Sequence, residues 1–458
     1  MDPSPHRARV FFRSLGCPKN QVDSEVMLGK LALEGYAVAE CVEDADVAVI
    51  NSCSFIGSAR DESIEVILEV ASLRETGQLR ALVVAGCLPQ RYGRELLDAL
   101  PEVDAFVGTA DFPRISSILD AALEGGSRGV YVESKRTYLP LESDPRLLIG
   151  SGHSAYLKIA EGCDRVCAFC AIPAIRGKFQ SRTLASLLAE AEQLSEYGVR
   201  ELNLVSQDST SFGKDQPGRP RLAELLRCLD RVDGLDWIRV LYLYPSAVDD
   251  DLIEVLAQGE RVLPYVDVPL QHASDWVLRA MRRGITADRQ RRLVEKLRQQ
   301  IPDLTLRTTF IVGFPGETDR DFEALCDFAR EVRFDRAGVF RYSDESSTTA
   351  FAHESKIPVK LALERYRVLV ALLSEIMAEK LDRLVGQRKE LLVDRGGPEL
   401  AVGRLRSQAP EIDGQVVVRA PSGRSPRAGE LLPVRITGVR GLDLEAELDE
   451  DRALSVPG

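Results

Sequence analysis

The chain has 458 residues, 45% hydrophobic and 28% charged, which is typical of a globular protein of about three domains. No apolar run reaches the length of a membrane span, and the first ten residues lack the apolar core of a signal peptide. We therefore expect no membrane segment and a cytoplasmic location, where nine cysteines indicate metal ligands or buried thiols rather than disulfides. The net charge of −12 argues against dedicated nucleic-acid binding, because neutralising phosphates requires basic residues.

Strand-like and helical segments alternate in the first predicted domain, residues 8–140. Apolar, β-rich segments cover residues 8–15, 45–51 and 79–85, and helical patterns separate them. This alternation predicts a parallel α/β sheet. Residues 132–150 contain two prolines and no clear period, and we interpret them as a linker to the next domain.

A cysteine follows each of these three predicted strands. Cys17, Cys53 and Cys87 are 36 and 34 residues apart, and each lies at or just after a strand end. The carboxyl ends of parallel strands border the crevice where such sheets bind ligands, so the three thiols should converge. One free cysteine there would indicate only a small buried side chain, but three at equivalent positions favour a metal site.

A second group, Cys163, Cys167 and Cys170, forms a C-x3-C-x2-C loop directly after another strand-like segment. Structural zinc sites and electron-transfer clusters normally take four protein ligands. Three cysteines on a cluster of four irons would leave one iron open, as catalytic metal sites do. The alternative is a zinc site completed by a distant ligand such as His153.

The second predicted domain, residues 141–385, contains six strand-like runs separated by helical patterns. Six βα units predict a barrel or partial barrel with its chemistry at the carboxyl ends of the strands. The cysteine loop follows the first strand, as that arrangement requires. A long helix over residues 359–385 should pack on the barrel. Polar residues expected at the strand ends are Gln207, Asp208, Tyr242, Tyr244, Gln271, His272, Arg307, Arg341 and Tyr342.

The last predicted domain, residues 386–450, changes to short alternating strands with glycine-rich breaks. This pattern predicts a small antiparallel β-barrel of OB-like size. From residue 386 to the end, 11 Lys and Arg stand against 12 Asp and Glu. A balanced charge disfavours RNA binding and suits contact with a cationic protein.

The C-x3-C-x-Phe-C loop resembles the signature of the radical S-adenosylmethionine (SAM) superfamily. The resemblance implies an open (β/α)6 barrel whose three cysteines hold a [4Fe–4S] cluster, with SAM on the open iron. Reductive cleavage of SAM would then give a 5'-deoxyadenosyl radical. It further implies that Phe169 lies by the adenine, that Gly313 and Glu317 belong to the adenine-contacting segment, and that Gln207, although it departs from the usual Gly-Gly-Glu form, occupies the position that holds the SAM amino group. Gln271, His272 and Ser274 match positions that contact ribose and carboxylate.

The segments GCPKN, NSCSFI and GCLPQRY resemble the amino-terminal domain of the methylthiotransferases, and the last domain resembles their TRAM domain. The resemblance implies that Cys17, Cys53 and Cys87 hold a second [4Fe–4S] cluster, which delivers sulfur. The segments SLGCPKNQVDSE, LVSQD, YLYP, PLQHAS and RTTFIVGFPGE resemble the branch that adds a methylthio group to the β-carbon of an aspartate in ribosomal protein S-twelve. The alternative is the branch that modifies a tRNA adenosine.

This resemblance also implies a one-electron reductant of the flavodoxin or ferredoxin type. It assigns no general acid or base, because radical abstraction of hydrogen requires none, and we therefore give His272 no catalytic role.

Overall fold

A computed structural model describes residues 7–77, 79–133, 138–420 and 425–449. The N-terminal domain is a parallel sheet of six strands flanked by helices, as predicted. In spatial order its strands are β2 (Ala37–Val38), β1 (Arg9–Ser14), β3 (Val47–Ser52), β4 (Ala81–Gly86), β5 (Ala105–Val107) and β6 (Gly129–Tyr131). Its helices are α1 (Pro18–Leu33), α2 (Gly57–Ser72), α3 (Cys87–Tyr92), α4 (Glu95–Ala99) and α5 (Ile115–Leu123). β3 and β4 are wholly buried because helices cover both faces, which is why their sequences are continuously apolar rather than alternating.

The central domain is an open barrel of six consecutive parallel strands. They are β7 (Ser154–Lys158), β10 (Glu201–Val205), β11 (Trp237–Val240), β12 (Tyr265–Asp267), β13 (Thr305–Val312) and β14 (Arg336–Arg341). A parallel bridge from Ile238 to Val262 joins the two halves, and the short antiparallel pair β8 (Ala160–Glu161) and β9 (Gln180–Ser181) flanks the cysteine loop. The helices are α6 (Ile172–Arg176), α7 (Leu184–Glu196), α8 (Leu222–Leu229), α9 (Asp250–Gln258), α10 (Asp275–Ala280), α11 (Ala287–Gln300), α12 (Asp319–Val332) and α13 (Val359–Asp382). The fold class predicted from six βα units is confirmed.

The C-terminal domain is a closed five-stranded barrel. Around the barrel run β15 (Arg388–Arg395), β16 (Leu400–Leu405), β17 (Val416–Arg419), β19 (Asp443–Leu448) and β18 (Leu431–Arg440). All neighbours are antiparallel except β17 and β19, which are parallel. None of the described helices is both long and apolar enough to cross a bilayer.

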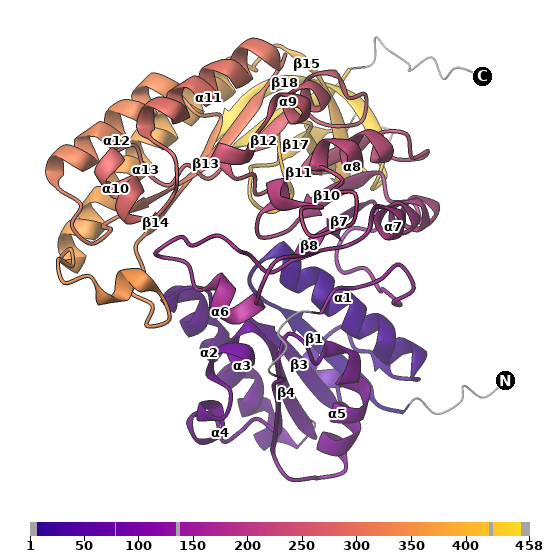
Figure 1. Ribbon diagram of the computed structural model, residues 1–458. Helices are drawn as coiled ribbons and strands as arrows, with labels where there is room; N and C mark the ends of the chain where they lie inside the picture. Colours follow the sequence, from indigo (N-terminus) through magenta and orange to yellow (C-terminus); the bar gives the residue numbers. More distant parts are fainter. Residues whose placement is uncertain (1–6, 78, 134–137, 421–424, 450–458) are drawn as a thin grey trace.

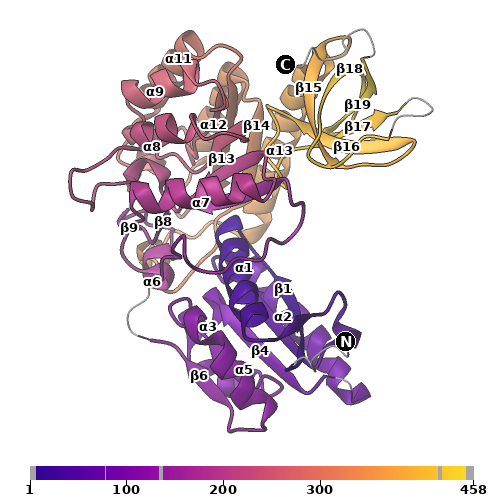
Figure 2. The same cartoon turned by 90° about the vertical axis from the view of Figure 1, so that its right-hand side faces the viewer.

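The C-terminal barrel packs against the amino-terminal end of the central barrel. Arg404 binds Glu201 at 2.6 Å, and Asp413 accepts a hydrogen bond from the Tyr265 hydroxyl at 2.7 Å. Figure 2 shows this yellow domain beside the central barrel and apart from the N-terminal sheet. The carboxyl ends of the barrel strands, where the chemistry was predicted, are therefore left to the N-terminal domain.

Helix α1 joins the N-terminal domain to the mouth of the central barrel. Met27 and Leu31 on one side pack in the core of the N-terminal sheet, whereas Val22 packs with Tyr156 and Leu241 of the central barrel. The helix is buried on nearly every side, which explains why its sequence lacks a simple amphipathic pattern. In Figure 1, α1 and α6 lie at the junction of the two domains.

The described part of the predicted linker is bound along α1. Arg146 forms ion pairs with Glu25 of α1 at 2.6 Å and with Glu190 of α7 at 2.6 Å. Gly29 of α1 permits this close approach, since a Cβ there would lie 2.3 Å from the Pro145 carbonyl oxygen. Residues 138–150 thus hold the two domains together, although their sequence predicted only a loop.

Candidate active site

The three cysteines of the N-terminal domain lie at the carboxyl ends of adjacent strands, as predicted. Cys53 follows β3 directly, Cys87 follows β4, and Cys17 is the N-cap of α1 after β1. Because β1, β3 and β4 are neighbours in the sheet, their ends bring the thiols together. Burial, with a smaller contribution from the neighbouring Cys87 and Cys17 thiols, raises the pKa of Cys53 to about 12.

Gly16 allows the first two of these cysteines to approach one another. Its φ is +88°, and a Cβ at this position would lie 2.7 Å from the Cys53 Cβ and 3.0 Å from its Sγ. Only glycine adopts this left-handed backbone without strain and also lacks the Cβ for which there is no space. The GCPKN sequence therefore turns from β1 into α1 with Cys17 directed towards its partners.

The cysteine loop of the central domain lies between β8 and α6. The Cys163 amide donates to the Gly177 carbonyl at 3.1 Å, and the Ala168 amide donates to Met281 at 3.0 Å, so both ends of the loop are fixed. Arg283 places a guanidinium nitrogen 3.3 Å from the Cys167 Sγ. A nearby cation stabilises a thiolate, which is the form that binds metal.

The two cysteine triads are adjacent. Cys87 packs against Ala171 and Ile175, and Ala171 is the residue that follows Cys170 of the central triad. Helices α3 and α6, which carry these residues, contact one another across the domain junction. The structure therefore brings the two triads together at the barrel mouth.

The number of donors in each triad bears on the kind of metal site it could form. In the described ranges, no three His, Cys, Asp or Glu side chains are grouped closely enough to hold one metal ion. A tetrahedral zinc site needs its sulfurs within about 4 Å of each other, whereas a [4Fe–4S] cluster binds each thiolate to a different iron and spaces them more widely. Each triad supplies three thiols, the number that would hold a [4Fe–4S] cluster with one open iron.

The alternative zinc site with His153 is not supported. His153 precedes β7 at its amino-terminal end, whereas Cys163 lies beyond its carboxyl end. Its Nε2 is 3.0 Å from Asp394 of the C-terminal barrel. The ring therefore belongs to the packing between two domains.

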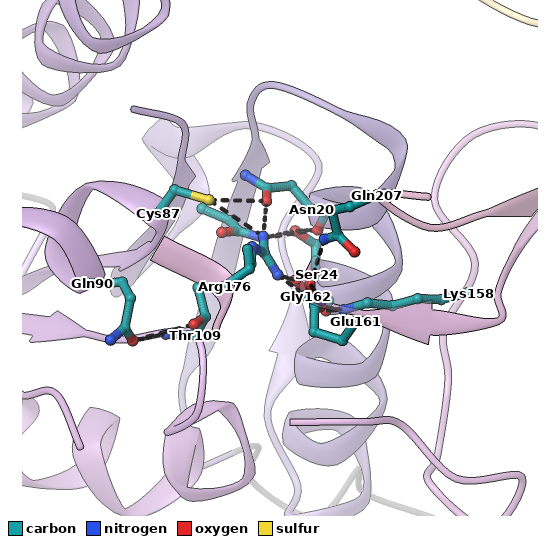
Figure 3. A network of polar contacts seen from close by, with 12 residues as sticks. Asn20, Ser24, Cys87, Gln90, Thr109, Lys158, Glu161, Gly162, Arg176 and Gln207 are labelled. Carbon is teal, nitrogen blue, oxygen red and sulfur yellow. Dashed lines mark hydrogen bonds and ion pairs between the residues drawn. The ribbon is translucent and has the colours of Figure 1, made fainter. Parts of the chain in front are cut away.

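Arg176 lies beside Cys87 and contacts both domains (Figure 3). This side chain, 2% exposed, extends from the end of α6 into the first turns of α1. Its guanidinium donates to the Asp23 carboxylate at 2.7 Å and to Glu161 at 3.0 Å, and it lies 3.4 Å from the Cys87 Sγ. It also hydrogen-bonds the Asn20 side-chain oxygen. One cation thus links the strand that leads to the cysteine loop with the thiols of the other domain.

Glu161 is the barrel's main carboxylate in this network. It binds Lys158 and Arg176, and it accepts a hydrogen bond from the Gln207 amide. Burial alone would raise the pKa of Glu161, but Arg176 and Lys158 outweigh it and lower the pKa to about 2. Glu161 is therefore ionised, and Gln207 retains a buried Oε1 with no hydrogen-bond partner among the described residues.

The segment after β12, the fourth barrel strand, contains further buried polar atoms without a hydrogen-bond partner in the described structure. Gln271 has a left-handed φ of +71°, and its side-chain oxygen is buried without a partner in the described structure. His272 is fully buried and accepts a hydrogen bond from the Ser274 amide through Nδ1, while its Nε2 has no hydrogen-bond partner among the described residues and lies 3.8 Å from a Glu317 carboxylate oxygen. Burial lowers the pKa of His272 to about 3, so the ring is neutral. Unsatisfied buried groups and backbone strain are features of binding sites.

The residues that the resemblance assigned to the adenine-contacting segment, Gly313 and Glu317, are bound to one another in the loop after β13. Glu317 accepts hydrogen bonds from the Gly313 amide at 2.8 Å and the Phe314 amide at 3.2 Å, and its other oxygen binds Arg365 of α13 at 2.9 Å. Burial raises the pKa of Glu317 to about 7 against the opposing effect of Arg365. Because both oxygens are occupied by protein groups, Glu317 shapes the loop after β13. Phe169 packs near Phe314, which belongs to this loop.

One polar residue predicted at a strand end lies elsewhere. Arg307 is the third residue of β13, which continues for five residues to Val312. It points into the amino-terminal half of the barrel and binds Asp267 at 2.8 Å. The prediction was wrong because Arg307 lies in the amino-terminal half of this strand and not at its carboxyl end.

Lys19 of α1 was not assigned a role from the sequence. Its ammonium lies 3.6 Å above the ring of Tyr242, which follows β11. Burial alone would lower the pKa of Lys19, yet Tyr242 and Cys17 raise it on balance, and the side chain remains a cation. Like Arg176, Lys19 contacts a residue of the other domain. The residues around Lys19 and Arg176 in the sequence contain no pattern that predicts these contacts.

Three family models match the chain. Residues 9–108 match the Uncharacterized protein family UPF0004, residues 157–329 the Radical SAM superfamily and residues 385–448 the TRAM domain. Together with the open six-stranded barrel and its cysteine loop, these matches define the class: a radical SAM enzyme with an added N-terminal α/β domain and a C-terminal TRAM barrel.

Similar proteins of known name show which family of radical SAM enzymes the chain belongs to. The ribosomal protein uS12 methylthiotransferase RimO of Sorangium cellulosum is 47% identical over 452 residues, covering 97% of this chain and 91% of the relative. The protein of the same name from Geobacter sulfurreducens is 43% identical over 445 residues, covering 96% and 99%. The chain belongs to the RimO family of methylthiotransferases, and the resemblance read from its motifs is confirmed.

Among solved structures, the radical S-adenosylmethionine methyltransferase TsrM from Kitasatospora setae superimposes with a TM-score of 0.54. The sequences are 15% identical, and the match covers 84% of this chain and 76% of that chain. A second structure of the same enzyme, with tryptophan and a SAM analogue, gives the same TM-score at 16% identity over 90% and 80%. These likenesses show a shared fold.

Proposed function

We propose that this enzyme uses SAM and two [4Fe–4S] clusters to add a methylthio group to the β-carbon of an aspartate in ribosomal protein uS12. The observation that carries the proposal is the packing of Cys87 against Ala171, which places two cysteine triads at one barrel mouth. A carbon radical reacts only with what lies beside it, so this chemistry needs the two centres adjacent. Relatives at 43–47% identity bear the uS12 name, which favours this substrate over the tRNA alternative.

The six cysteines are the proposed cluster ligands. Cys163, Cys167 and Cys170 would hold the cluster that binds SAM, and Cys17, Cys53 and Cys87 the cluster that supplies sulfur. With SAM bound and an electron supplied, such a pair of clusters provides hydrogen abstraction from unactivated carbon and a sulfur donor. The high pKa of buried Cys53 and Cys170, about 12 for each, means that these thiols lose their protons when metal binds.

The chain's own residues position these centres and keep water away. Helix α1 covers the barrel mouth, and Arg176 joins it to α6 through the Asp23 and Glu161 carboxylates. Arg283 and Arg176 place cations beside one thiol of each triad. A fixed, enclosed site of this kind shields a reactive radical from competing quenchers.

The SAM contacts are proposed from the unsatisfied polar atoms. Gln207 Oε1 and Gln271 Oε1 have no partner among the described residues and suit the amino and hydroxyl groups of SAM. Phe169 would lie by the adenine, with the Gly313 backbone shaped by Glu317. His272 and Ser274 would orient the loop between them through their mutual hydrogen bond.

The finer partner assignments are also proposals. A cytoplasmic location suits reduction by a one-electron donor of the flavodoxin or ferredoxin type. The net charge of −12 suits a basic ribosomal protein and disfavours a dedicated nucleic-acid site. In the TRAM barrel Arg404 is 4% exposed and bound to Glu201 and Asp394, so that cation is not available to RNA.

The test offers uS12 and bulk tRNA separately to anaerobically reconstituted enzyme with SAM, sulfide and dithionite. Mass spectrometry should find an added methylthio group on an aspartate of uS12 and none on tRNA. Modified tRNA with unmodified uS12 would overturn the proposed substrate. Failure to cleave SAM under any of these conditions would overturn the radical reaction itself.

A further inference from the structure

Two buried cations at the mouth of the barrel, Lys19 and Arg283, have no carboxylate partner in the described part of the chain. Arg283 is already bound to the Pro269 carbonyl and lies close to the Cys167 thiol. Lys158 and Arg176 share the Asp23 and Glu161 carboxylates, and all four side chains are at most 2% exposed. Lys19, 7% exposed, lies beside them and has no carboxylate within ion-pair distance in the described part of the chain. A buried charge without a partner is costly, so such a group is usually retained for a ligand.

Tyr242 holds this ammonium in place at a strained position. The Tyr242 φ is +62°, a left-handed value that is uncommon for a residue with a bulky side chain. The backbone is fixed there because the Tyr242 amide donates to Asp267 at 3.0 Å and its carbonyl accepts from Ser209 at 3.0 Å. The strain directs the ring beneath Lys19, where a cation–π contact orients the ammonium without neutralising it.

The ammonium borders the site rather than the closed core. Cys17, two residues before Lys19, and Tyr242, whose ring the ammonium covers, are both partly exposed. Lys19 belongs to the first turn of α1, whose N-terminus adds positive potential. An anionic group bound here would lie beside the triad proposed to supply sulfur.

We propose that Lys19 binds the side-chain carboxylate of the substrate aspartate, and this inference rests on the proposed function. The aspartate β-carbon is bonded directly to the carboxyl carbon, so an ion pair at Lys19 fixes the carbon to be modified next to Cys17. The substrate charge would also balance the Lys19 ammonium. Lys19 is thus the residue that distinguishes aspartate from asparagine.

The experiment compares wild type, Lys19→Met, Lys19→Gln and Lys19→Arg on uS12 and on uS12 whose target aspartate is replaced by asparagine. Lys30→Met is the matched control, since Lys30 lies on the same helix but pairs with Asp144. For each enzyme, iron content, the electron paramagnetic resonance (EPR) spectrum and SAM cleavage without substrate are measured beside kcat/KM for methylthio transfer.

A charged hydrogen bond of the usual strength corresponds to about a tenfold to hundredfold effect. Lys19→Met and Lys19→Gln should lose that factor in kcat/KM on native uS12, keep the wild-type rate on the asparagine substrate, and retain both clusters and SAM cleavage. Lys19→Arg should recover part of the loss, and Lys30→Met should behave as wild type.

Two results would contradict the proposed role of Lys19 and leave the proposed function of the enzyme intact. In the first, wild type modifies uS12 and the Lys19 variants keep its preference for aspartate over asparagine. In the second, the variants lose iron or change the EPR signal of the N-terminal cluster, so that Lys19 serves as a counter-ion to Cys17. If wild type modifies neither substrate, the proposed function itself fails.

Discussion

The two cysteine triads are built in opposite ways. The central triad lies within eight consecutive residues of one loop, from Cys163 to Cys170, and its ends are fixed by backbone hydrogen bonds. The N-terminal triad spans 71 residues, from Cys17 to Cys87, and exists only because three strands end at the same edge. The first site depends on local sequence and the second on the whole domain. Arg176 and α1 join them into one site, and the predictions below separate their contributions.

The largest effect should follow removal of the central triad. Replacing Cys163, Cys167 and Cys170 together by alanine should lower the iron content to half and abolish both SAM cleavage and methylthio transfer, because SAM would have no cluster to bind. Iron analysis and detection of 5'-deoxyadenosine measure the two quantities. Cys41→Ala, at an exposed cysteine without an assigned role, should retain full iron and activity. SAM cleavage that survives the triple change would contradict the assignment.

Removal of the N-terminal triad should instead separate the two activities. With Cys17, Cys53 and Cys87 replaced by alanine, iron should again fall to half and methylthio transfer should cease, while SAM cleavage continues without productive coupling. The reason is that the loop of the central triad keeps its own hydrogen bonds. A variant that keeps methylthio transfer would show that sulfur comes from elsewhere.

Arg176→Met should destabilise the junction between the domains. The change leaves the buried Asp23 and Glu161 carboxylates with Lys158 as their remaining partner in the network, and breaking a buried ion pair typically costs about 3–5 kcal/mol. Chemical denaturation measures the loss. Arg227→Met, which removes exposed pairs with Asp251 and Glu254, should cost about 1 kcal/mol or less. Equal losses in the two variants would show that the Arg176 network does not hold the domains together.

A smaller effect concerns the buried, neutral ring of His272 after the fourth barrel strand. Burial lowers the pKa of His272 to about 3, well below the usual value of 6.5. The unfolded chain gains a proton as the pH falls below 6.5, whereas the folded protein does not until about pH 3. This residue therefore contributes stability above pH 6.5 that is lost on acidification, by about 1.4 kcal/mol per pH unit.

His272→Asn cannot gain that proton, so its free energy of unfolding should fall less than that of wild type between pH 7 and pH 5. The difference should reach about 2 kcal/mol at pH 5. Denaturation of both proteins at the two pH values measures it. Parallel pH dependences would indicate that His272 is protonated in the folded enzyme.

The sequence predicted the elements well because their signals are local. Runs of apolar residues predicted β1, β3 and β4 and the six barrel strands, although the short strands β2, β5 and β6 were missed. The spacing of Cys163, Cys167 and Cys170 indicated a cluster without any tertiary information. Even the convergence of the N-terminal cysteines followed from one rule about parallel sheets. The prediction that residues 132–150 form a linker missed their role, because the ion pairs of Arg146 involve partners far away in sequence.

What the sequence could not give is which side chains join the domains. Arg176 and Lys19 each follow a cysteine motif closely, yet their partners come from other domains and no spacing rule connects them. The same holds for Arg307, which lies inside the barrel and pairs with Asp267 of the neighbouring strand β12. Charged side chains whose partners are distant in the sequence can be identified only in the folded structure.

The adjacency of the two centres is the central claim, and EPR of the dithionite-reduced enzyme tests it most directly. The spectrum of wild type is compared with the spectra of the two triple alanine variants, each of which retains one cluster. Magnetic interaction should broaden or split the wild-type signal relative to the sum of the two variant spectra, because Cys87 packs against the loop of the other triad. A wild-type spectrum equal to that sum, with full iron in both sites, would contradict a shared active site.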